Sequence, residues 1–107
     1  MARLISIPDE QVAALGDEDR IQAHYGDELL LNELITLAEM ADELTGRWAQ
    51  APREEREKFL GERADVLERG DHLASRPPDE FSPLLREELV RASADWQRTR
   101  AGIVAVS

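Results

Sequence analysis

The sequence predicts an all-α protein: a single helical bundle of about four main helices, with short extended, β-like segments at residues 3–7 and 102–106. Three observations predict this fold class. Apolar residues recur at spacings of three and four through the middle of the chain, which is the period of an amphipathic helix. The five prolines lie between these periodic stretches or at their starts. The length of 107 residues fits one domain, 1–107, with one hydrophobic core.

Two short helical stretches are expected first. Residues 8–15 predict a short helix, because Pro8 is a favoured first helical residue and Gly16 is a favoured stop. Asp17 is a good cap for a second stretch. Gly26 either ends that stretch or lies inside a continuous helix, at a cost of about 1 kcal/mol.

The clearest predicted helix runs from Asp27 to about Gln50. Its apolar residues form a stripe wide enough to pack against more than one neighbour, as the central helix of a bundle does. The stripe consists of Leu30, Leu31, Leu34, Ile35, Leu37, Ala38, Ala41, Leu44 and Trp48.

Two further helices complete the predicted bundle. Residues 53–75 carry two adjacent rows of apolar residues at seven-residue spacing, which form one helical face. The paired prolines at 77–78 end this helix, because each disfavours a helical residue before it. Asp79 or Ser82 then caps a last helix, which is expected to end near Gly102.

Both ends of the chain are expected to be extended. Residues 3–7 alternate in polarity and are partly β-branched, whereas 102–106 lack a helical period. A lone strand needs a partner edge. The two segments are therefore expected to pair with each other, with a second copy in a homodimer, or with the sheet of another protein, unless they are frayed tails.

The composition restricts the class of partner and the compartment. A net charge of −10 argues against binding to nucleic acid or to anionic membrane surfaces. The absence of cysteine excludes disulfides and thiolate metal sites. Because no apolar run suits a signal peptide or a membrane span, the expected location is the cytoplasm.

The negative charge is concentrated in the first half of the chain. Residues 1–50 hold 11 acidic and three basic residues, whereas residues 51–107 hold 12 acidic and 10 basic residues. One interpretation is a solvated surface. The other is a face that docks onto a basic partner or imitates the phosphates of DNA.

No metal site, cofactor or catalytic site is predicted. Neither His24 nor His72 has the glutamate three residues before it that di-iron bundle sites need, and Glu68 with His72 is explained as a surface ion pair. The best candidate for acid–base chemistry is His24 and Tyr25 beside Asp27 and Glu28. An enzyme is therefore the less favoured interpretation.

The leading functional hypothesis is a non-enzymatic protein–protein interaction module, either an adaptor or a small accessory subunit of a larger bacterial-type assembly. The first alternative is an acidic inhibitor, such as an immunity protein, an antitoxin or a DNA mimic. The second alternative is a small-ligand or metal-binding enzyme built around His24 or His72. The residues predicted to contact a partner are Asp17, Glu18, Asp19, Asp27, Glu28, Trp48, Trp96, Ile103 and Val104.

Overall fold

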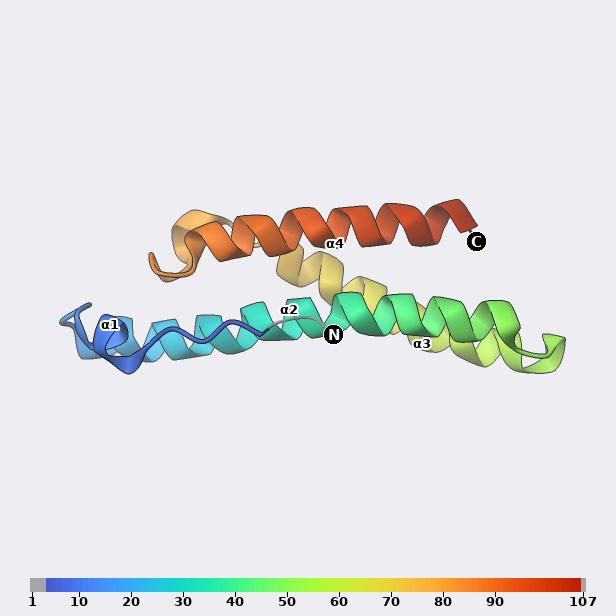
Figure 1. Ribbon diagram of the computed structural model, residues 1–107, viewed down its shortest axis with the longest axis horizontal. Helices are drawn as coiled ribbons and strands as arrows, with labels where there is room; N and C mark the ends of the chain where they lie inside the picture. Colours follow the sequence, from blue (N-terminus) through green and yellow to red (C-terminus); the bar gives the residue numbers. More distant parts are fainter. Residues whose placement is uncertain (1–3, 107) are drawn as a thin grey trace.

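The computed structural model describes residues 4–106, which contain four α-helices, one short 3-10 helix and no strand. The elements are α1 (Asp9–Ala13), α2 (Glu18–Gln50), α3 (Arg53–Ala74), η1 (Pro78–Glu80) and α4 (Arg86–Val106). The predicted all-α bundle is confirmed. The molecule is a rod of 55 × 20 × 19 Å. α3 folds back beside α2, and α4 lies along α2 (Figure 1).

The central helix α2 is continuous over 33 residues. Its N-cap is Asp17, whose carboxylate accepts the backbone N–H of Asp19 at 2.9 Å. Gly26 lies inside it, so the two helical stretches expected on either side of this glycine are one helix. A glycine inside a helix costs about 1 kcal/mol. Packing offsets this cost at Gly26, because the neighbouring His24 and Asp27 are buried.

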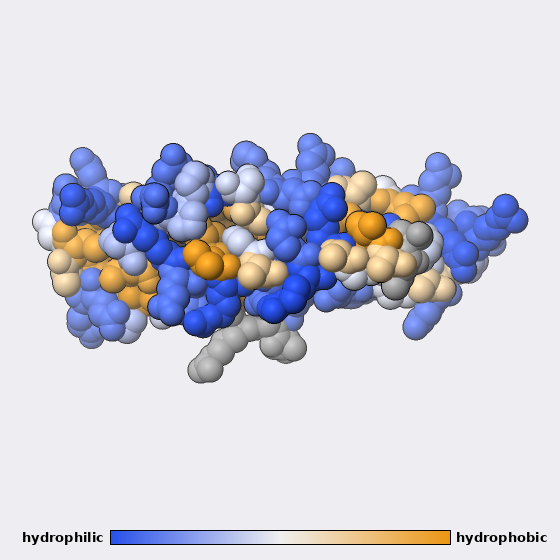
Figure 2. Space-filling view, turned by 90° about the horizontal axis from the view of Figure 1, so that it is seen from above, coloured by the Kyte–Doolittle hydropathy of each residue, from blue (hydrophilic) through white to orange (hydrophobic). Residues whose placement is uncertain are grey.

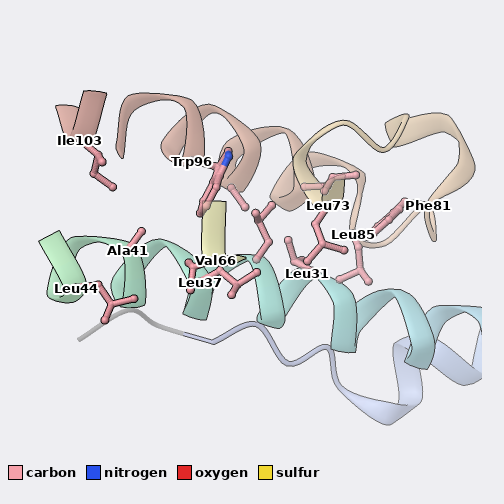
Figure 3. Close-up of a cluster of buried hydrophobic side chains, with 13 residues drawn as sticks. Leu31, Leu37, Ala41, Leu44, Val66, Leu73, Phe81, Leu85, Trp96 and Ile103 are labelled. Carbon is pink, nitrogen blue, oxygen red and sulfur yellow. The ribbon is translucent and has the colours of Figure 1, made fainter. Parts of the chain in front are cut away.

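The wide stripe of α2 faces both other long helices. Figure 3 shows Leu31 and Ala41 of α2 and Trp96 and Ile103 of α4 entering the space between the two helices. The stripe prediction is confirmed for the residues that form this core, while Trp48 at its end is only half-buried. The buried core consists of Leu31, Leu34, Leu37, Ala41, Leu44, Val66, Leu73, Phe81, Leu85, Leu89, Ala92, Trp96 and Ile103.

Gly70 of α3 and Trp96 of α4 make a close contact between these two helices. A side chain at Gly70 would overlap the Trp96 ring, so the absence of a Cβ lets the ring lie on the backbone of α3. The Trp96 Nε1–H donates to Asp71 Oδ1 at 2.8 Å, and the Arg100 Nε–H donates to both Asp71 oxygens at 2.9 Å. Asp71 therefore fixes both α4 residues beside the glycine.

The prediction of an extended segment at 102–106 is wrong, because α4 continues through Val106. Continuing the helix buries Ile103, which is only 3% exposed. Burial of an isoleucine contributes about 1.5–3 kcal/mol, which exceeds the cost of about 1 kcal/mol for Gly102 in a helix. Packing against the rest of the bundle thus outweighs the β-propensity of the valines.

The N-terminal segment is not a strand either. Residues 4–7 have no regular secondary structure, and Arg3 lies outside the described residues. The Asn32 side chain accepts the backbone N–H of Ile5 at 2.7 Å and donates to its carbonyl at 2.9 Å. Both backbone groups that would form a ladder at Ile5 are therefore bound to α2, and the expected ribbon between the two chain ends does not form.

Candidate functional site

Three of the residues predicted to contact a partner are buried, which corrects the prediction for them. Trp96 is 0% exposed and Ile103 is 3% exposed, because both pack into the core. Asp27 is 9% exposed, and its Oδ2 accepts the backbone N–H of Ser82 at 2.8 Å. None of these side chains offers a surface to a partner.

The other predicted contact residues are spread over the rod. Asp17, Glu18 and Asp19 are exposed at the start of α2, whereas Trp48 is near its end, about 45 Å away along the helix. Val104 is exposed on α4. The structure therefore does not gather these residues into one surface.

Trp48 lies under two guanidinium groups. The Arg56 and Arg63 carbons Cζ are 5.7 and 5.5 Å from the centre of its ring, within the range of cation–π attraction. Arg56 also donates from Nε to the Ala51 carbonyl at 3.1 Å, where the chain turns from α2 into α3. Trp48 thus stabilises this turn.

A buried polar cluster lies at the other end of the bundle, around His24. This side chain is 0% exposed, with Nδ1 2.6 Å from Ser82 Oγ and Nε2 3.2 Å from Glu28 Oε2. Glu28 Oε2 also accepts the backbone N–H of Ile7 at 3.3 Å. The cluster ties the N-terminal segment and the segment before α4 to α2.

The order Ser82–His24–Glu28 resembles that of a hydrolytic triad, but its setting does not suit nucleophilic catalysis. Ser82 is only 5% exposed. Its backbone N–H, a group that could stabilise an oxyanion, is taken by the carboxylate of Asp27. A fixed negative charge at this point opposes the charge that develops during acyl transfer. We therefore interpret the cluster as a structural clamp.

His72 is exposed on α3 and lines a shallow hollow with Asp65, Glu68 and Arg69. All four residues belong to a single helix. Within residues 4–106, no group of three or more histidine, aspartate or glutamate side chains is arranged to hold a metal ion.

A row of exposed, largely apolar side chains on α2 was not predicted from the sequence. Tyr25, Leu29 and Met40 are 39%, 73% and 41% exposed, and their spacing places them on one outward face with Thr36. The signal was present in the sequence, because Leu29 and Met40 are apolar residues outside the predicted stripe. α1 contacts the row at Tyr25, whereas Leu29 and Met40 remain exposed within residues 4–106.

The row leads into a groove between α2 and α3. Met40, Leu44 and Val66 supply its apolar surface, while Glu62 and Asp65 of α3 stand at its edge with Glu43 and Arg47 of α2. Glu43 and Arg47 form an ion pair with each other. Within the described part of the chain, the carboxylates of Glu62 and Asp65 have no ion-pair partner.

The face formed by α4 also carries exposed apolar residues. Figure 2, which looks onto α4, shows apolar residues in small patches separated by hydrophilic ones. α4 contributes the exposed valines Val90 and Val104 to its surface.

Beside the groove, an ion pair joins α2 to α3. Arg69 Nε and Nη2 donate to the two Glu33 carboxylate oxygens at 2.6 and 3.1 Å. The hydrogen bond from Arg69 lowers the pKa of Glu33, and the charge of Arg69 adds to this effect against the opposing effect of desolvation. The pair links the two helices through their exposed side chains.

We expect the Glu33–Arg69 ion pair to stabilise the fold at pH values above the ordinary Glu pKa of 4.5. This stabilisation is expected to be lost as the pH falls through the lowered pKa of Glu33. Because both side chains are more than a third exposed, Glu33→Gln is expected to cost less than about 1 kcal/mol at neutral pH. Urea unfolding of both proteins at neutral and strongly acidic pH measures this cost. An equal cost at both pH values would contradict the assignment.

The Tyr25 side chain of α2 forms a hydrogen bond to α1. Its hydroxyl donates to Asp9 Oδ1 at 3.0 Å, and this hydrogen bond is the largest cause that raises the pKa of Tyr25 above 10.0. Desolvation and the charges of Asp9 and Glu28 raise it further. The stabilisation is therefore present below the ordinary pKa and is lost as the pH rises through the raised one.

Because Tyr25 is the only tyrosine, tyrosinate absorbance measures its titration directly. We expect Asp9→Asn to move the midpoint back toward 10.0. Asp42→Asn makes the same change in net charge on α2 away from Asp9, and we expect it to have little effect. Equal shifts in the two variants would show that overall charge, not the hydrogen bond, controls the titration.

Comparison with known proteins gives no relative: no family model, no curated protein and no solved structure matches this chain. Over the described residues, none of the helices combines the length and the apolar character needed to cross a lipid bilayer. The function must therefore be inferred from the chain's own residues.

Proposed function

We propose that the chain is a non-enzymatic protein–protein interaction module, acting in the cytoplasm as an adaptor or a small accessory subunit of a larger assembly. The exposed row on α2 carries this proposal. Leu29 is 73% exposed in the middle of a long helix, on the same face as Tyr25 and Met40. Clustered apolar side chains on a soluble surface are typical of protein-binding sites.

An acidic inhibitor is the second candidate, and the net charge of −10 favours it. An inhibitor that occupies a basic site by charge alone would lose its binding steeply as salt increases. A module that binds through Leu29 and Met40 would retain much of its affinity in salt.

Site-specific photo-crosslinking in the native cells tests the proposal. A photoreactive amino acid at position 29 is expected to yield a discrete adduct with one partner protein. The same group at position 90 is the control, because Val90 is also an exposed apolar residue but lies on α4. A monomer that gives no adduct from position 29 or 40 would overturn the proposal.

A further inference from the structure

Building on the proposed function, we infer that the exposed row on α2 and the adjoining α2–α3 groove bind a basic, amphipathic α-helix of the partner. The row provides apolar contacts along one line. The groove provides carboxylates on one side of that line. Such a surface corresponds to the helix-in-groove mode of recognition.

The length and spacing of the row fit a helix. Leu29 and Met40 are 11 residues apart, which is about 16 Å along α2, or three helical turns. A partner helix with apolar residues at i, i+4, i+7 and i+11 presents a stripe of the same length. Thr36 lies between the two residues and is exposed, so the partner can approach α2 closely there.

The charges of the groove favour arginine or lysine on the flank of the partner helix. Arg47 and Arg69 are occupied by Glu43 and Glu33, whereas Glu62 and Asp65 have no ion-pair partner among residues 4–106. A long basic side chain can lay its methylene groups over Met40 and place its charge beside these carboxylates. The hollow at this point has a volume of about 400 Å³, which gives such a side chain room.

Charge also argues against two other occupants of this surface. A second copy of the chain would bring the same unpaired carboxylates of Glu62 and Asp65 against each other, and each copy carries a net charge of −10. A nucleic acid would add phosphates of the same sign. A basic protein helix is the occupant whose charge complements the surface.

Methyl NMR of the full chain tests this inference. The chain has two methionines, Met1 and Met40, so labelled methionine methyl groups give one signal directly in the groove. The probe is a synthetic helix with leucine at i, i+4, i+7 and i+11 and arginine on its flanks. We expect it to shift the Met40 signal saturably, whereas the same peptide with glutamate in place of arginine leaves the signal unchanged.

A pair of matched variants separates the groove from overall charge. We expect Glu62→Gln with Asp65→Asn to weaken binding of the arginine peptide about five- to tenfold, as for loss of one or two surface ion pairs. Glu57→Gln with Asp79→Asn makes the same change in charge at exposed positions that do not line the groove, and should change affinity less than about twofold. Circular dichroism confirms that each variant is folded.

Two results would overturn the inference. One is a Met40 signal that the arginine peptide leaves unchanged. The other is equal weakening by both variant pairs, which would show only general attraction to an acidic protein. If position 29 nevertheless crosslinks to a partner in cells, the proposed function stands and the inferred chemistry of the partner is wrong.

Discussion

Replacement of Gly70 by alanine is expected to destabilise the protein by about 3 kcal/mol. Helix propensity alone predicts the opposite, a gain of about 0.5–1 kcal/mol for alanine in a helix interior. The sign reverses because the new Cβ would overlap the Trp96 ring. That ring cannot shift freely, since it is fully buried and its Nε1–H is bound to Asp71.

Gly61 is the control for this prediction. It lies in the same helix, and a Cβ at this position meets no atom within 4 Å. Gly61→Ala should therefore stabilise the protein by about 0.5–1 kcal/mol. Urea unfolding of the two variants measures both effects, and equal changes would show that the Trp96 ring does not constrain residue 70.

A double-mutant cycle identifies the contact itself. Trp96→Phe shortens the ring and removes the hydrogen bond to Asp71, so it is destabilising alone. If the overlap is the cause, Gly70→Ala should cost much less in the Trp96→Phe background than in the natural protein. Additive costs in the double variant would refute the steric explanation.

The local pattern of the sequence was sufficient to predict most of the helical segments, but not the end of α4 or how the helices meet. The stripe from Leu30 to Leu44 and the prolines at 77–78 act through neighbouring residues, so α2 and the end of α3 could be predicted. Ile103 becomes helical because it is buried in the bundle core, which no local pattern contains. Helix propensity alone makes Gly70 unfavourable in its helix, while its role depends on a tryptophan 26 residues away.

The same reason limits what could be predicted of the candidate site. His24 was predicted to belong to a polar cluster with Tyr25, Asp27 and Glu28, since these residues are close neighbours in the sequence. Its partner Ser82 is 58 residues away and was expected only as a helix cap. The exposed row on α2 could have been found, because Leu29 and Met40 lie off the stripe, but the carboxylates beside it come from another helix.

The clamp around His24 gives the second large prediction. His24→Ala is expected to cost about 3 kcal/mol, because it empties a fully buried site and leaves the Ser82 hydroxyl and one Glu28 contact without a partner. Hydrogen exchange should show the loss first in the segment before α4, where the Ser82 N–H is bound to Asp27.

Two comparisons separate this clamp from a catalytic role. Ser82→Ala removes the hydroxyl while His24 stays in place, and should cost only about 1 kcal/mol. In the double variant the costs should not add, because the two side chains share one hydrogen bond of 2.6 Å. Thermal and urea unfolding measure these values. If both single variants keep the full free energy of unfolding, the buried cluster does not hold the fold together, and a chemical role for Ser82 and His24 becomes the better explanation.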